Sequence, residues 1–462
     1  MRYSRKLDLG GESTIKNKDP RAALRFVLPS LLGVLIFLTP IRWNGELTIG
    51  IGVITGNVLA LMGEYGLPVV VVIMTISSAL TVVATLFRAQ WIRNNEWLAS
   101  IFDVPMSWLL IRLTGAVFGI MYLFQFGPAL ILSDGVGGAV FDGIAVNVLA
   151  VYISACLLLP LLTDFGFMEY VGTLARPLFR SVFRLPGRAA IDATASFVGA
   201  SAIGLLITIG QYERRYYTQR EAAVIAANFS VVSIPFSLVV AKVSGIGHLF
   251  VSWYGVVVLT CIAAAIITPR LPPLSRKKDE FLDGATGDSL RHEEPGQVLL
   301  AEAWHAAIER AEKSGGLVRF LTNGLRNLLF FLFSVVAATM ALATLAALLT
   351  FHTPVFEWLG WPLAVVLDAA GLPETATAAP GLFAGFMDQY MPAVVAIGID
   401  SETTSFLLAG LSVCQLVFMS EVGVLILRSK LPLGFVDLFV IFLLRTAIAL
   451  PPLFAGAMLF AR

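Results

Sequence analysis

The stretch LFVSWYGVVVLTCIAAAIIT, residues 249–268, is 20 residues long and contains no charged side chain. A helix of that length rises about 30 Å, which matches the hydrocarbon thickness of a lipid bilayer. The strands of a membrane barrel would instead be about 10 residues long and would alternate apolar with polar side chains. The stretch therefore predicts a transmembrane α-helix.

Apolar runs of similar length recur along the whole chain of 462 residues. They lie at 24–41, 67–87, 105–126, 144–162, 221–243, 249–268, 325–350, 403–427 and 434–460. Only 14% of the residues are charged, whereas a soluble domain would carry about 25%. The sequence therefore predicts an all-α polytopic membrane protein with about nine transmembrane helices.

Basic side chains are segregated along the chain. Residues 1–25 carry seven Lys and Arg residues, whereas none occurs between Arg112 and Arg176 or between Arg326 and Arg428. Short loops rich in Lys and Arg stay on the cytoplasmic side of a membrane. We therefore expect the N-terminus to be cytoplasmic, with the later loops alternating from there.

Residues 189–210 are apolar enough to cross the membrane, but a crossing would place Arg214 and Arg220 outside and invert every later loop. The middle of this segment is rich in small residues, namely Ser196, Gly199, Ser201 and Gly204. Irregular backbone at membrane depth is tolerated where protein or a wet cavity surrounds it. We therefore expect a re-entrant hairpin that enters from the cytoplasm.

Residues 376–400 form a second ambiguous segment, on the other side of the expected membrane. Its helix-breaking and polar residues are Pro380, Gly381, Gly385, Asp388, Gln389 and Pro392. We expect a second re-entrant hairpin, entering from the outer face. The alternative is that 376–400 never enters the bilayer and that Asp388 is an ordinary loop acid.

The two halves of the chain then have the same order of elements in opposite directions across the membrane. Inverted-topology repeats of this kind place a solute site near the midplane, between the repeats. The predicted organisation is a cytoplasmic basic N-terminus at 1–23, N-terminal transmembrane helices at 24–143, a first repeat at 144–268 with hairpin 189–210, a cytoplasmic loop at 269–316, and a second repeat at 317–462 with hairpin 376–400.

Three stretches carry a family resemblance: FLTPIRWNGELTI (37–49), VFRLPGRAAIDATASFVGASAIGLLI (182–207) and YYTQREAAVIAANFSVVSIPFSLVV (216–240). They resemble the YjiH family of gate-domain membrane proteins, and the likeness covers most of the chain. The gate domain is shared distantly with concentrative nucleoside transporters, the membrane part of the FeoB iron transporter and spore-maturation proteins. The resemblance implies a multi-pass protein of the bacterial inner membrane with a nucleoside-recognition type of fold.

In the nucleoside transporters, the hairpin tips and the helices after them hold the substrate and the coupling cation. By position, the resemblance places these roles on Ser196, Gly199, Ser201, Asn228, Ser230, Ser233, Asp388, Gln389, Ser412 and Gln415. The polar residues that define the nucleoside carriers are not matched here, so nucleoside specificity does not follow. The chain also has no G-x-x-x-x-G-K-[ST] motif, so it lacks a nucleotide-binding P-loop.

Ser230, Ser233 and Ser237 recur at helical spacing and form one stripe, which Pro235 interrupts by freeing a backbone carbonyl. The stripe is a candidate solute-facing surface. The alternative is that each hydroxyl bonds the carbonyl one turn back. Gln415 has a stronger case for a polar partner, because an unpartnered amide in hydrocarbon costs several kcal/mol.

Glu421 and Arg445 are charged residues inside otherwise apolar runs. Ionisable residues at such depth almost always face a partner or water. A short connection joins their helices, so we expect a buried ion pair that fixes the last two helices together. The alternative role for Arg445 is binding of an anionic group of the solute.

The sequence gives no indication of an enzyme. The four histidines do not cluster, so no metal site is predicted, and no G-x-S-x-G nucleophile motif occurs. Cys156, Cys261 and Cys414 lie inside apolar runs and predict neither disulfides nor metal ligands. We expect no cofactor and no nucleic-acid partner.

Two functions remain open. The first is a secondary transporter of a small polar solute, nucleoside-like or another metabolite, coupled to Na⁺ or H⁺. The second is a non-transporting subunit that acts with a companion gate-domain membrane protein or as a homo-oligomer. Both place the chain in the lipid bilayer.

Overall fold

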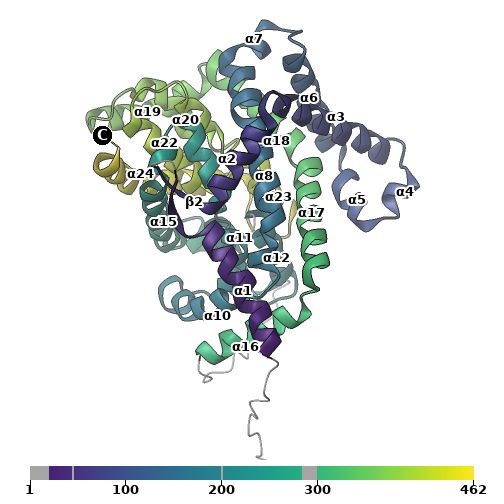
Figure 1. The fold of residues 1–462 in the computed structure, drawn as a ribbon. Helices are drawn as coiled ribbons and strands as arrows, with labels where there is room; N and C mark the ends of the chain where they lie inside the picture. Colours follow the sequence, from purple (N-terminus) through teal and green to yellow (C-terminus); the bar gives the residue numbers. More distant parts are fainter. Residues whose placement is uncertain (1–19, 44–45, 199–200, 283–298, 462) are drawn as a thin grey trace, which may run out of the picture.

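The computed structural model describes residues 20–43, 46–198, 201–282 and 299–461 (Figure 1). The N-terminal part contains α1 (Pro20–Phe37), β1 (Pro40–Trp43), β2 (Glu46–Ile49), α2 (Gly50–Met62), α3 (Gly66–Thr85), α4 (Gln90–Arg93), α5 (Glu96–Phe102), α6 (Met106–Leu123) and α7 (Ala129–Leu132). It is followed by η2 (Asp134–Ala145), α8 (Val146–Leu158), α9 (Pro160–Thr163), α10 (Phe167–Leu178), η3 (Phe179–Phe183), α11 (Ala189–Val198), α12 (Ser201–Glu213), α13 (Gln219–Asn228), α14 (Ile234–Val243) and α15 (Phe250–Ile267). The last part contains α16 (Leu299–Lys313), α17 (Gly316–Ser334), α18 (Val336–His352), α19 (Val355–Ala369), α20 (Thr375–Ala384), α21 (Met391–Ala396), α22 (Glu402–Cys414), η8 (Met419–Gly423), α23 (Val424–Arg428) and α24 (Phe435–Phe460).

Helical stretches long and apolar enough to cross a membrane dominate the described residues. There are seven: Gly50–Thr85, Met106–Leu123, Asp134–Thr163, Gly247–Arg270, Val318–His352, Glu402–Arg428 and Phe435–Phe460. They confirm an all-α polytopic membrane protein. Of the nine predicted spans, those at 24–41 and 221–243 have no counterpart among the seven. The first corresponds to α1, and the second is broken between α13 and α14.

The Gly-rich segment 127–143 is largely helical. It contains α7 and most of η2, a π-helix that continues into α8. A Cβ atom at Gly137 would lie 2.3 Å from the Ile131 carbonyl oxygen and 2.4 Å from the Tyr122 ring. The missing side chain therefore lets η2 pack closely against the end of α6.

Two predicted spans are interrupted rather than continuous. The first breaks at Phe229–Ser233, between α13 and α14, and Pro235 lies in the first turn of α14. Proline has no N–H to donate, so it tends to begin a new helix. The second breaks at 415–418, between α22 and η8, where Leu416 has a φ of 56°.

Two pairs of short helices precede these interrupted helices. The first pair is α11 and α12, whose connecting residues 199–200 lie outside the described residues. A Cβ at Gly204 would lie 1.7 Å from the Ser196 hydroxyl, so only glycine allows α11 and α12 to approach this closely. The second pair is α20 and α21, joined by the turn 385–390.

Contacts between α15 and α22 join the two halves of the chain. The Trp253 side chain is fully buried, and its indole N–H donates to the Phe406 carbonyl at 3.2 Å. Further along the same helices, the Sγ atoms of Cys261 and Cys414 lie 3.7 Å apart. The halves therefore share one packed core at this interface.

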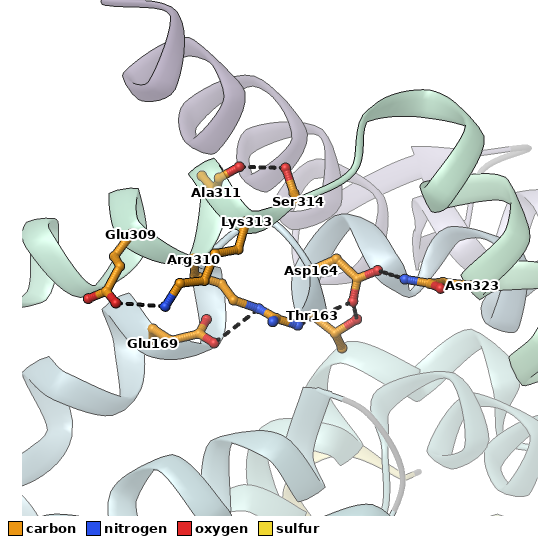
Figure 2. Close-up of polar contacts among 9 residues, drawn as sticks. All are labelled: Thr163, Asp164, Glu169, Glu309, Arg310, Ala311, Lys313, Ser314 and Asn323. Carbon is orange, nitrogen blue, oxygen red and sulfur yellow. Dashed lines mark hydrogen bonds and ion pairs between the residues drawn. The ribbon is translucent and has the colours of Figure 1, made fainter. Parts of the chain in front are cut away.

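Helix α16 lies at one end of the molecule with α10 and the start of α1 (Figure 1). The Arg310 guanidinium points between two carboxylates, with Nε 3.4 Å from Glu169 and Nη2 3.8 Å from Asp164 (Figure 2). Asp164 also accepts from the Asn323 side chain of α17 at 2.7 Å. This polar network fixes α16 to both neighbouring segments.

Candidate functional site

A cavity of about 450 Å³ lies between the α20–α21 pair and the second interrupted helix. Asp388, Gln389 and Tyr390 line it from the turn between α20 and α21. Ser420 and Glu421 line it from η8, directly after the helix break. Its size falls within the range of small-molecule sites.

A smaller cavity of about 60 Å³ adjoins it and shares Tyr152, Phe236, Phe331, Gln389 and Glu421 as lining residues. It is also lined by Val232, Ser233 and Pro235, which belong to the break between α13 and α14 and the start of α14. Both interrupted helices therefore reach the same region, one from each half of the chain.

The Asp388 side chain is buried and ties the α20–α21 turn to the broken helix. Its Oδ1 accepts from the Tyr390 backbone N–H at 2.8 Å, and the Ser420 hydroxyl also hydrogen-bonds to the carboxylate. The backbone N–H groups of Met419 and Ser420 donate to the Phe386 and Met387 carbonyls at 2.8 and 3.0 Å. The break in the helix thus provides the donors that hold the turn in place.

Gln389 and Tyr390 leave polar atoms without a hydrogen-bond partner among the described residues. These atoms are Gln389 Oε1 and the Tyr390 hydroxyl, and both side chains are less than 10% exposed. A buried polar atom without a partner costs about 1–3 kcal/mol. Because both residues line the cavity, these atoms are candidate contacts for a solute or an ordered water.

Aromatic side chains form the walls of the cavity. The rings of Tyr152 and Phe331 stack with centroids 5.1 Å apart, and those of Phe236 and Tyr390 lie 4.5 Å apart. The cavity thus combines apolar walls with a small set of converging polar groups, as small-molecule sites do.

Arg445 is fully buried between the two interrupted helices. Its Nε donates to the Cys414 carbonyl at 2.9 Å, and its Nη1 donates to Asn228 Oδ1 at 2.8 Å. Asn228 ends α13 and Cys414 ends α22, so the guanidinium sits at the C-terminal, electronegative ends of two half-helices. These partners differ from the predicted ion pair with Glu421, which instead lines the cavity.

Among the predicted site residues, Asp388 and Gln389 meet in the large cavity, and Ser233 reaches the smaller one. The Ser412 hydroxyl donates to the Gln389 carbonyl and so supports the turn. The Gln415 amide donates to the Leu382 carbonyl and to the Thr446 hydroxyl, both at 3.0 Å. The Gln415 side chain therefore links α20 to α24 through these two hydrogen bonds.

The remaining predicted residues have other contacts. The Ser230 hydroxyl donates to the Ala226 carbonyl at 2.9 Å, which matches the alternative of a bond one turn back. Asn228 binds Arg445, and Ser196 packs against Gly204. Gly199 and the Ser201 side chain lie outside the described residues.

Several cavity residues were not predicted. Tyr152, Phe236 and Phe331 carry no sequence signal, because aromatic residues in apolar runs look the same whether they line a core or a cavity. Ser420 and Tyr390 are adjacent in sequence to the predicted site residues Glu421 and Gln389, and only this adjacency indicates a place in the site. Arg428 was singled out in the sequence only as the basic residue that ends a long stretch without Lys or Arg.

Comparison with known proteins gives two matches. Residues 145–247 match the Gate family, described as nucleoside recognition. An uncharacterized protein of Alkalihalophilus pseudofirmus is 41% identical over 429 residues, which cover 93% of this chain and 92% of the relative. The family match includes the α11–α12 pair and the first interrupted helix, α13–α14.

Proposed function

Because this chain belongs to the YjiH-like family of gate-domain integral membrane proteins, we propose that it is a secondary transporter of a small polar solute across the bacterial inner membrane. The observation that carries the proposal is the cavity of about 450 Å³ bounded by a helix-pair turn and a helix break. Interrupted helices flanking a central solute site are typical of secondary transporters.

The proposed architecture is a pair of inverted repeats. The first comprises α8, α10, the α11–α12 pair, α13–α14 and α15. The second comprises α17–α18, α19, the α20–α21 pair, α22–α23 and α24. Each therefore has one helix pair followed by one broken helix, and both pairs are re-entrant hairpins in this proposal.

In the proposed mechanism, the α20–α21 hairpin moves relative to the broken helix. Asp388 connects the two through Ser420, so a solute that reaches this carboxylate alters the contact that holds the hairpin closed. Trp108, Asn327 and Arg428 line the same cavity from segments that we expect near the cytoplasm. The described conformation is then inward-facing, and Asp388 and Glu421 are the candidate carboxylates for coupling to H⁺ or Na⁺.

The direct test is solute uptake by the purified chain alone in proteoliposomes, with gradients of Na⁺ or H⁺ applied separately. We expect uptake driven by one of the two gradients, and Asp388→Asn should abolish coupling without preventing folding. The matched control is Asp368→Asn, in α19 away from the cavity lining. Uptake that requires a co-purified membrane protein would instead support the companion-subunit function.

A further inference from the structure

One helix face carries charges of opposite sign at its two ends. Glu421, Val424, Leu425 and Arg428 all line the large cavity, and their spacing places them on one side of the η8–α23 segment. The seven residue steps from Glu421 to Arg428 rise about 10 Å along the axis. A solute lying along this face therefore meets a carboxylate at one end and a guanidinium at the other.

The acidic end is reinforced by the second hairpin. Asp388 lines the same cavity and is linked to Ser420, the residue before Glu421. Gln389 Oε1 is an acceptor without a partner among the described residues, and its side chain is 7% exposed. Two carboxylates and an unpaired amide oxygen form a set of acceptors that suits an ammonium group.

The basic end is provided by Arg428. Its guanidinium lies 5.6 Å from the centroid of the Trp108 ring, which keeps it on the cavity wall. Arg112 also lines the cavity, but its Nη1 and Nη2 already donate to Thr81, Ile101 and Ser334. Arg428 is therefore the cation that is placed to receive a carboxylate from a solute.

Resting on the proposed transport function, we infer that the solute is a zwitterion whose ammonium and carboxylate lie two or three residue lengths apart. Two or three residues of extended peptide span about 7 to 10 Å, which matches the distance along the helix face. The ammonium binds at Asp388 and Glu421, the carboxylate binds at Arg428, and the aromatic walls cover the middle. A neutral nucleoside carries no ammonium for the acidic end and no carboxylate for Arg428, which disfavours its binding relative to a zwitterion.

The test uses the purified full-length chain in detergent and measures affinity by calorimetry. The probes are triglycine, N-acetyl-triglycine without an ammonium, triglycinamide without a carboxylate, 6-aminohexanoate and uridine. We expect triglycine and 6-aminohexanoate to bind, and loss of either charge from triglycine to weaken binding by about tenfold or more. Tighter binding of triglycine than of 6-aminohexanoate would identify the peptide groups as part of the recognised chemistry.

Variants assign each end of the solute. Arg428→Gln should weaken triglycine and leave triglycinamide unchanged, whereas Glu421→Gln should weaken triglycine and leave N-acetyl-triglycine unchanged. Lys430→Gln, two residues from Arg428 but not a lining residue, is the matched control and should behave as the parent chain. Each variant is first checked for a single melting transition and an unaltered elution volume.

The outcomes separate this inference from the proposed function. Binding of uridine without binding of triglycine or 6-aminohexanoate overturns the zwitterion and leaves the transporter standing. Triglycine affinity that is indifferent to Arg428→Gln also overturns it. If none of the five probes binds, the zwitterion inference fails, and proteoliposome uptake with a wider set of solutes decides the transporter separately.

Discussion

At the scale of single residues, Arg445 explains how two broken helices are held together. It supplies a fixed positive charge to the C-terminal ends of α13 and α22, where backbone carbonyls lack helical partners. Its partner Asn228 is 217 positions away in sequence. The buried position of Arg445 could be predicted from its place in an apolar run, but a partner so distant could not, because the sequence alone favours the nearer Glu421.

A double-mutant cycle separates the observed partner from the predicted one. Arg445→Gln should destabilise the protein by about 3 kcal/mol, because two buried acceptors lose a charged donor. Asn228→Ala should couple to it by about 1 kcal/mol or more, whereas Glu421→Gln should add independently. The measurement is thermal or denaturant unfolding of the four proteins in each cycle. Strong coupling of Arg445 to Glu421 in place of Asn228 would contradict the described geometry.

At the scale of elements, α16 is attached to the rest of the protein by a close backbone contact as well as by ion pairs. Gly166 has a φ of +101°, and a Cβ atom there would lie 2.3 Å from the Ala307 carbonyl oxygen. Burial raises the pKa of the nearby Glu169 carboxyl, and the Arg310 guanidinium opposes that rise. Because the pKa of Glu169 is higher in the folded than in the unfolded state, protonation of this carboxyl favours the folded protein. That contribution to stability is lost as the pH rises through the folded-state pKa.

Gly166→Ala should loosen α16. The left-handed conformation alone costs about 1–2 kcal/mol for alanine, and the clash with Ala307 adds to it. We expect faster trypsin cleavage after Arg310 and Lys313 in the purified protein, followed by mass spectrometry. Gly255→Ala is the control, since a Cβ there meets nothing within 4 Å. Equal cleavage rates in both variants would mean that α16 is not held by this contact.

The elements also mark what the sequence could and could not predict. The run 249–268 predicted α15 almost to the residue, because a long charge-free stretch has few alternatives to a membrane helix. The break at 229–233 was not predicted, because Ser230 and Ser233 also fit the serine stripe of one continuous helix. Asp388 and Gln389 were found as polar residues in an apolar segment, whereas the aromatic walls of their cavity gave no comparable contrast.

At the scale of the whole molecule, the proposed inverted topology makes a specific statement about Arg214. If α11 and α12 form a re-entrant hairpin, this exposed residue lies in the cytoplasm. In a chain with Cys156, Cys261 and Cys414 replaced, Arg214→Cys should react with an impermeant maleimide only after the inner membrane is permeabilised. All three native cysteines are buried, so their removal leaves the surface unchanged.

The matched control is Glu357→Cys in α19, an exposed position that the proposal places on the outer side. It should react in intact cells. Labelling of Arg214→Cys in intact cells would show that 189–210 crosses the membrane completely. That result would contradict the proposed inverted repeats.

The place of Arg445 has a consequence for the symmetry of the molecule. It lies on α24, whereas α15, its proposed counterpart, carries no charged residue from Phe250 to Ile267. In two inverted repeats that exchange conformations, the inward-open and outward-open forms would be related by a two-fold rotation in the membrane plane and equal in free energy only if both repeats had the same sequence. The unmatched guanidinium of Arg445 makes the two forms unequal in free energy, so a transporter of the proposed kind would favour one of them at rest.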